Sequence, residues 1–260
     1  MGVSKELVKT VTYSISIRLS TDGFYFVVTD AKDSARRVCR RWEVNRQRSM
    51  AANVKAFLAD NEELRRHYHQ TDIVVHSPRY TVMPLALYED GHDEDVFYLN
   101  LTRMSNENVL CNVLGKSGLV VLFSIDKLTH QFIIDNFPSA RIFASVSPQL
   151  EEWSARCKED SGSNCLFANI HPESMDVICF CGGHLQLVNS YASATVDDRC
   201  YYIAGIWSRL GLDSRNDRLC LAGDKTLCEE VSGVMKEWTG EASLEDGDIP
   251  FDLESLITYK

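Results

Sequence analysis

Apolar and polar side chains alternate near the start of the chain. Every second residue from Tyr13 to Leu19 is apolar, and the residues between them are polar or charged, a spacing typical of a half-buried β-strand. Residues 20–23 have the composition of a tight turn, and the aromatic and β-branched residues 24–29 predict a second, antiparallel strand. A third strand is predicted over residues 37–44. The chain is therefore expected to begin with three consecutive antiparallel strands.

Segments with helical spacing then alternate with short apolar strands. Residues 50–64 carry apolar side chains at intervals typical of an amphipathic helix. The elements predicted after it are a strand over residues 71–77, a helix in two parts over 84–87 and 93–101, a hairpin from 108–114 and 119–124, a helix over 127–136, a strand over 141–145 and a helix over 147–157. Helices and strands thus alternate through the middle of the chain.

The opening pattern returns in the last part of the chain. Three strands are predicted over residues 164–170, 175–181 and 184–191, and the last two are joined by Gly182 and Gly183, which favour a two-residue hairpin turn. The elements predicted to complete this copy are a helix over residues 196–210 that ends at Gly211, a strand over 218–222 and a helix over 225–238. The order strand, strand, strand, helix, strand, helix therefore occurs twice.

Two copies of this order predict a duplicated α/β protein with mixed sheets, because three antiparallel strands are followed by strands that helices connect in parallel. We expect a first half-domain over residues 1–162, with an inserted or extended α/β segment at about 84–160, and a second half-domain over residues 163–260.

Composition adds the class of protein. The chain has 260 residues, of which 45% are hydrophobic, enough for a substantial core, and a net charge of −10 that argues against a general nucleic-acid binder. No run of about 18 apolar residues predicts a membrane span, and the polar residues 1–10 lack the pattern of a secretory signal. The nine cysteines lie mostly in apolar runs, as buried reduced thiols do. A cytoplasmic location is expected.

The charge is distributed unevenly. Residues 1–60 carry 11 basic and 6 acidic side chains, and the remaining residues carry 16 and 31. The arginines that cause much of this difference are Arg36, Arg37, Arg40, Arg41, Arg46 and Arg48. Such a cluster could dock an acidic partner or, locally, RNA. It could also be a solvated face, or pair with acidic residues of the second half such as Asp197 and Asp198.

The order of elements is that of the ribonuclease H-like half-domains that pair in the actin-like ATPase fold. Nearly the whole chain also resembles a family of bacterial proteins of unknown function that is described as actin-like. The stretches that carry this resemblance are YSISIRLS at residues 13–20, LVNSY at 187–191, DDRCYYI at 197–203 and LGLD at 210–213. The resemblance implies an actin-like ATPase fold and brings no established activity.

The resemblance also implies where a nucleotide would bind. Actin-like ATPases hold phosphates in the hairpin turn after the first strand of each half and Mg²⁺ with aspartates at those strand ends, since the transferred phosphoryl group needs a metal and close backbone donors. Here the second such turn, residues 171–174, lacks glycine and contains Pro172, which has no N–H. On the adenosine side, actin-like ATPases have an apolar strand that runs into two glycines, and here only Gly223 remains. The residues that could still contact a nucleotide are Asp22, Gly23, Gly223 and Asp224.

The sequence gives little support to two other catalytic functions. A ribonuclease H-type nuclease needs several carboxylates around two metal ions, one of them inside the first strand, and residues 12–19 and 164–170 contain no acid. Gly115-Lys116-Ser117 resembles the end of a phosphate-binding loop, but Leu110 stands where the earlier glycine belongs.

Histidines and cysteines suggest no metal site. Cys179, Cys181 and His184 lie close in sequence but lack a Cys-x-x-Cys pair, so structural thiols are favoured over zinc. His67 and His69 follow a predicted helix and are interpreted as helix-capping residues.

These observations favour a non-catalytic, cytoplasmic actin-like module, a pseudo-enzyme with a protein-interaction or scaffold role and no catalytic or metal-binding residues. The alternative is an ATP-binding protein, or a phosphotransfer ATPase with a degenerate site, in which ATP and Mg²⁺ would be the cofactors. The expected partner is a protein, with nucleic acid restricted to the arginine-rich segment; partner identity and oligomeric state stay open.

Overall fold

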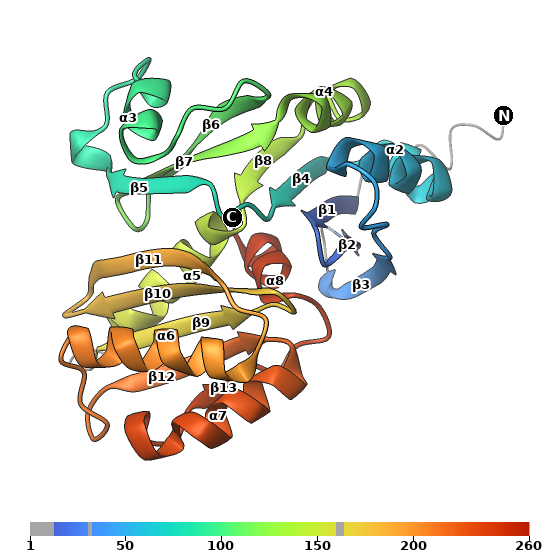
Figure 1. Ribbon diagram of the computed structural model, residues 1–260. Helices are drawn as coiled ribbons and strands as arrows, with labels where there is room; N and C mark the ends of the chain where they lie inside the picture. Colours follow the sequence, from blue (N-terminus) through green and yellow to red (C-terminus); the bar gives the residue numbers. More distant parts are fainter. Residues whose placement is uncertain (1–12, 31–32, 160–163, 260) are drawn as a thin grey trace, which may run out of the picture. The chain divides into compact units, whose positions relative to one another are not determined.

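The computed structural model describes residues 13–30, 33–159 and 164–259 (Figure 1). The residues inspected for a secretory signal, 1–10, lie outside this part. The chain divides into two compact units, Met1–Leu114 with Gly118–Ser147, and Gly115–Ser117 with Pro148–Lys260. The segment from Pro148 to residue 159, assigned above to the first half, thus groups with the second unit. Trp153 in this segment stacks on Phe167 of that unit.

A five-stranded mixed sheet forms the centre of the first unit. Its strands are β1 (Tyr13–Ser20), β2 (Gly23–Asp30), β3 (Asp33–Trp42), β4 (Gln70–Val75) and β8 (Arg141–Ala144). The order is β3-β2-β1-β4-β8, with β1, β2 and β3 antiparallel and β4 and β8 parallel to β1. This confirms the predicted hairpin and the mixed sheet, although the third strand begins and ends earlier than expected.

Two helices pack on this sheet and form the core of the unit with it. The helix α2 (Met50–Asp60) begins at Ser49, whose Oγ accepts from Ala52 N (3.2 Å), and α4 (Lys127–Asn136) begins at Asp126, which caps it in the same way. The ring of Phe57 in α2 lies 5.3 Å from that of Phe24 in β2. The predicted helix over residues 50–64 is therefore correct as far as residue 60, and a short 3₁₀ helix, η1 (Glu62–Arg65), follows it.

A smaller sheet in the first unit consists of the inserted strands in the order β5-β7-β6. Its elements are β5 (Tyr80–Pro84), η2 (Leu85–Leu87), α3 (Asp93–Asn100), β6 (Glu107–Leu114) and β7 (Leu119–Asp126). The hairpin and α3 were predicted, whereas β5 was not, and residues 85–87 form only a 3₁₀ turn. The run Tyr-Thr-Val-Met-Pro is short, and its strand conformation depends on pairing with β7.

Glu107, at the start of β6, ties this smaller sheet to its loops. Its carboxylate accepts from Arg79 Nε and Nη2 (2.9 and 2.8 Å), Tyr98 OH (3.2 Å) and Met104 N (3.2 Å). Burial by itself raises the pKa of Glu107, but the hydrogen bonds from Arg79, Ser124 and Met104 outweigh it and hold this pKa at about 2, below its usual 4.5. The ionised form of Glu107 therefore stabilises the folded state.

We expect Glu107→Gln to lower the free energy of unfolding by about 2 kcal/mol at pH 7. Since the pKa of Glu107 is lower in the folded than in the unfolded state, its contribution is complete above about pH 4.5 and is lost as the pH falls towards 2. The difference between the two proteins in urea unfolding should therefore shrink between pH 5 and about pH 2. An unchanged difference across this range would contradict the assignment.

The second unit repeats the five-stranded arrangement. Its strands are β9 (Cys165–Ile170), β10 (Ser174–Cys181), β11 (His184–Ala192), β12 (Arg218–Gly223) and β13 (Ser243–Leu244). The order is β11-β10-β9-β12-β13, with β10 antiparallel to β9 and β11, and β12 parallel to β9. Gly182 and Gly183 both have positive φ, 56° and 77°, as the predicted hairpin turn requires.

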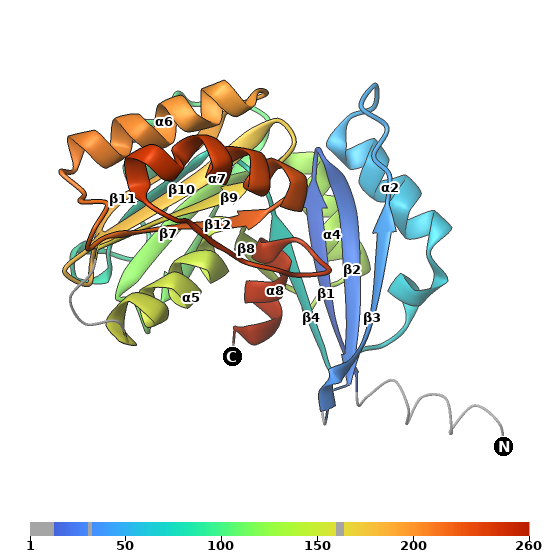
Figure 2. The same cartoon turned by 90° about the horizontal axis from the view of Figure 1, so that it is seen from below.

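Helices cover both faces of this second sheet (Figure 2). One face packs on α6 (Val196–Arg209) and α7 (Lys225–Thr239) in an apolar cluster that includes Leu166, Ile203 and Val231. The other face carries α5 (Val146–Glu159) and α8 (Phe251–Thr258). Among the described helices of both units, none has the length and apolar character needed to cross a membrane.

Candidate functional site

The turn between β1 and β2 is where the first phosphate-binding turn was expected. The Asp22 carboxylate accepts from Arg18 Nη1 (2.6 Å) and Nη2 (3.2 Å), and Arg18 itself is only 1% exposed. This is a two-pronged pairing, the strongest geometry for an arginine and a carboxylate. Because a Mg²⁺ ion takes oxygen ligands and is repelled by a neighbouring guanidinium, this carboxylate is poorly placed to hold the metal.

The sequence reading missed Arg18. A phosphate or metal site calls for glycines and acids in such a strand and turn, and a base on the polar side of β1 is not part of that pattern. Arg18 alternates with Ser16 and Ser20, and Asp22 follows four residues later across the turn. An arginine on the polar stripe of a hairpin strand, followed by an aspartate in the turn, is the signal that could have found the pair.

The corresponding turn of the second unit joins β9 to β10. The His171 N–H donates to Ser174 O (2.9 Å), and Glu173 O accepts from Ser193 N (3.0 Å), while Pro172 has no N–H to donate. The His171 donor is therefore used within the turn, and the proline supplies none for a phosphate.

Arg199 of α6 lies behind this turn and is only 1% exposed. Its Nη2 donates to His171 O and Pro172 O (both 2.9 Å). Its Nε and Nη1 have no hydrogen-bond partner among the described residues. Burial lowers the pKa of Arg199, against the attraction of Asp198 and Asp224. A buried guanidinium with unmet donors fits an anion or ordered water.

Asn169 is a second buried polar group at the end of this sheet. It is 0% exposed, and neither atom of its amide is hydrogen-bonded within the described part of the chain. Its Oδ1 lies 2.9 Å from the position that a Cβ on Gly223 would take. The carboxyl ends of β9 and β12 thus gather unsatisfied polar atoms, which sequence patterns alone do not reveal.

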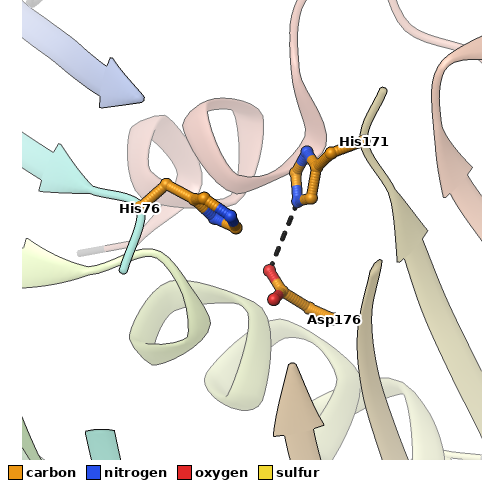
Figure 3. A group of neighbouring side chains, drawn as sticks. All are labelled: His76, His171 and Asp176. Atoms are coloured by element: carbon orange, nitrogen blue, oxygen red, sulfur yellow. Dashed lines mark hydrogen bonds and ion pairs between the residues drawn. The ribbon is translucent and has the colours of Figure 1, made fainter. Parts of the chain in front are cut away.

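Asp176 is the centre of a buried polar network beside α5, and Figure 3 shows its contact with His171. The Asp176 carboxylate contacts His171 Nε2 (3.3 Å) and accepts from Ser190 Oγ (2.5 Å) and Gln149 Nε2 (3.4 Å). A nucleophilic triad needs the histidine between the serine and the acid. Here the acid lies between them, so the network does not activate Ser190 and instead joins β10, β11 and α5.

Gly223 and Asp224, the expected adenosine-side residues, both have roles in the fold. Gly223 has φ 107°, and a Cβ there would lie 2.1 Å from Ile170 O. Asp224 caps α7, since its Oδ1 accepts from Leu227 N (3.1 Å). Asp22 and Gly23 occupy the turn of the first unit described above. The assignment of these four residues to a nucleotide stays a prediction.

The family follows from the sequence as a whole. The family described as a protein of unknown function (DUF3822) matches residues 4–237. This chain belongs to the DUF3822 family. No curated protein matches the sequence.

Solved structures confirm the fold of this DUF3822 protein. A Bacteroides thetaiotaomicron VPI-5482 protein with an actin-like ATPase fold and unknown function is 29% identical, with a TM-score of 0.88 over 98% of this chain and 99% of that one. The PilM–PilN type IV pilus biogenesis complex matches with 11% identity and a TM-score of 0.51, over 95% of this chain and 90% of that one. The predicted actin-like ATPase fold is correct.

The arginine cluster of the DUF3822 chain lies on an edge strand. Within the described part of the chain β3 is the last strand of its sheet, and the arginines on it, Arg36, Arg37, Arg40 and Arg41, are exposed. Arg46 and Arg48 follow in the turn that leads to α2. Nearby glutamates pair with two arginines of the cluster. Arg40 Nε lies 3.5 Å from Glu63 Oε1, and Arg41 Nε lies 3.2 Å from Glu43 Oε1.

Two sequence motifs have structural roles in this protein. Gly115-Lys116-Ser117 is a turn between β6 and β7, and its Lys116 and Ser117 N–H groups donate to Glu151 Oε1 (3.2 and 3.3 Å). The sulfurs of Cys179 and Cys181 lie 4.0 Å apart. Burial raises the pKa of both thiols, which disfavours the thiolates that zinc requires.

Proposed function

We propose that this chain is a non-catalytic module of the actin-like ATPase fold that acts in the cytoplasm by binding another protein. The observation that carries the proposal is the Arg18–Asp22 pair, in which a buried guanidinium grips the one carboxylate of the first turn. Phosphoryl transfer depends on a metal ion that such a carboxylate would hold and on backbone donors around the phosphates.

The second unit supports the same proposal. β9 carries the amide of Asn169 and no carboxylate, and the following turn contains Pro172. Asp224 is engaged as the cap of α7. The residues that a phosphotransfer enzyme would use therefore have structural tasks or unsuitable chemistry.

We expect the purified protein to release no phosphate from Mg–ATP above the buffer rate. Its Tm with Mg–ATP should not exceed its Tm with ATP and EDTA by more than about 1 °C, because Asp22, gripped by Arg18, is poorly placed to hold the metal that a catalytic site would require. Phosphate release and differential scanning fluorimetry give the two readings. Hydrolysis that needs Mg²⁺ and disappears in Asp22→Asn would contradict the proposal.

A second candidate is binding of a nucleotide or another phosphate without turnover. The buried Arg199 favours it, because its Nε and Nη1 are unpaired among the described residues and a phosphate oxygen is a suitable acceptor. A thermal melt with ATP and EDTA, in which no Mg²⁺ is available, separates nucleotide binding without turnover from the first proposal. A rise of several degrees in Tm that is lost in Arg199→Lys, each measured against its own ligand-free Tm, would favour this second candidate over the first.

The surface proposed for the partner is the exposed edge of β3. An edge strand offers unpaired backbone groups to an added strand, and basic side chains along it select an acidic one. The PilM–PilN complex shows that a protein–protein complex is known among structures of similar fold. We therefore propose an acidic extended segment as the partner, with RNA as the competing outcome.

We expect Arg36→Glu with Arg48→Glu to weaken binding of a fluorescein-labelled Glu-rich peptide about tenfold or more, measured by anisotropy, because the charge is reversed where the acidic segment would lie. Arg40 and Arg41 are avoided because each contacts a local glutamate. The matched control is Arg209→Glu with Arg215→Glu, two exposed arginines of the second unit. Equal binding by both variants, or tighter arginine-dependent binding of a single-stranded RNA, would contradict a protein partner at this edge.

A further inference from the structure

An open cavity of about 390 Å³ lies in the first unit, between the segment that leads into β4 and the loop that joins α4 to β8. It is lined by residues 64–71 on one side and 136–141 on the other. β4 begins at Gln70 and β8 at Arg141, so the cavity is at the amino ends of these parallel strands. The β1–β2 turn lies at the other end of the same sheet, because β1 runs parallel to β4 and ends at Ser20.

The lining of this cavity is basic. It contains the guanidinium groups of Arg65, Arg66 and Arg141, the imidazoles of His67 and His69, and no carboxylate. The whole chain, in contrast, has 37 acidic residues against 27 basic ones. The cavity lining is therefore positively charged although the chain as a whole is negatively charged, and a positively charged cavity attracts anions.

The arginines of the lining differ in how far they are already engaged. Arg141 Nε and Nη2 donate to the two oxygens of Asp72 (2.7 and 2.9 Å), so its charge is matched. Arg65 Nη2 donates to Ala59 O (2.8 Å). No hydrogen bond or ion pair within the described residues involves the side chain of Arg66. Arg65 and Arg66 therefore bring charge to the cavity that no carboxylate of its wall balances.

Hydrogen bonds and packing hold both walls in place. The Tyr68 hydroxyl donates to Glu63 O (2.9 Å), and His69 N donates to Tyr13 O at the start of β1 (2.8 Å). On the opposite wall, Ala140 N donates to Phe137 O (3.0 Å), and the rings of Tyr68 and Phe137 pack against the core. The cavity is thus preformed, which lowers the entropy cost of binding a ligand.

The carboxyl end of α4 borders the cavity and would by itself disfavour an anion. Two carbonyls near this end have donors. Phe137 N donates to Ile133 O (2.7 Å), and Asn136 Nδ2 donates to Phe132 O (2.8 Å). Arg65 and Arg66 on the opposite wall each carry a full positive charge, which together outweigh the negative charge of about half a unit at a helix end.

We propose that this cavity binds a small phosphate ester, with the phosphate held by Arg65 and Arg66 and the organic group against Tyr68 and Phe137. A planar guanidinium can hold two oxygens of a phosphate at once, and the near-double negative charge of a phosphate monoester matches two arginines better than the single charge of a carboxylate does. The volume falls in the range of cavities that hold small ligands. This site goes beyond the proposed docking of a partner on β3 and does not depend on it.

Phenyl phosphate is the probe, and isothermal titration calorimetry at constant ionic strength is the measurement. Arg65→Gln with Arg66→Gln should raise the Kd of phenyl phosphate at least about tenfold, since two charge-assisted contacts are lost. Arg209→Gln with Arg215→Gln, which removes the same charge from exposed positions of the second unit, should leave the Kd unchanged. Benzoate should bind the unmodified protein more weakly than phenyl phosphate, and inorganic phosphate should also bind more weakly because it lacks the ring.

The result is decisive in either direction, because the substituted arginines are exposed and the variants are expected to keep the Tm of the unmodified protein. Absence of binding by the unmodified protein would overturn the proposal. So would equal losses in the two double variants, which would show a general charge effect. Benzoate binding as tightly as phenyl phosphate would overturn the choice of phosphate.

Discussion

Gly223→Ala is expected to lower the free energy of unfolding by about 3 kcal/mol or more, because two penalties coincide at this position. The backbone there has φ 107°, which side-chain-bearing residues rarely adopt, and a Cβ would lie 2.1 Å from Ile170 O and 2.8 Å from Ile170 N. β12 pairs with β9 at this point, Gly223 opposite Ile170. The strands must therefore separate locally to admit a methyl group.

Gly233→Ala is the matched control for this substitution. Gly233 lies within α7, and a Cβ there would meet no described atom within 4 Å apart from its own chain neighbours and the backbone of its helix. Alanine should therefore stabilise the protein by about 0.5–1 kcal/mol through its helix propensity. Urea unfolding followed by circular dichroism measures both changes. If Gly223→Ala unfolds at the same urea concentration as the unmodified protein, the close approach of β9 and β12 is wrong.

Trp153→Ala is expected to be comparably severe, with a loss of about 4 kcal/mol. Trp153 is 0% exposed and lies between two rings of the second unit. Its ring centre is 4.7 Å from that of Phe167 in β9 and 4.9 Å from that of Phe251 in α8, with interplanar angles of 10° and 16°. Alanine would remove both ring contacts and leave a cavity where α5, the sheet and α8 meet.

Trp153→Phe tests whether stacking or the indole N–H matters. The Nε1 of Trp153 has no acceptor among the described residues, so phenylalanine removes an unsatisfied donor and keeps a stacked ring. We expect this variant to lose only about 1 kcal/mol in the same urea experiment. If phenylalanine lowers the free energy of unfolding as much as alanine does, a stacked ring at this position contributes little to stability.

The regular part of the fold could be predicted because its signals are local. The alternation in β1, the paired glycines between β10 and β11, and Gly211 after α6 each specify a conformation within a few residues. Repetition of the same order of elements then points to mixed sheets. β5 escaped prediction because its five residues become a strand only by pairing with β7, more than thirty residues later.

The candidate sites were harder to predict than the fold. Arg18 and Arg199 are charged residues that composition assigns to the surface, yet the structure buries both. Their partners are a turn aspartate and two backbone carbonyls, and a backbone acceptor leaves no trace in a sequence. The basic cavity likewise requires loops before β4 and before β8 to meet, which only the parallel pairing of these strands brings about.

The position of the arginines on β3 has a consequence for handling the protein. Two copies whose exposed strands approach each other meet like charges, so the edges repel and edge-to-edge joining is suppressed. Salt weakens this protection, because screening shortens the reach of the repulsion from about 10 Å at 0.1 M to about 3 Å at 1 M. Binding of an acidic segment weakens under the same conditions. Ionic strength would thus shift this edge from attracting the proposed acidic segment at low salt towards tolerating its own copies at high salt.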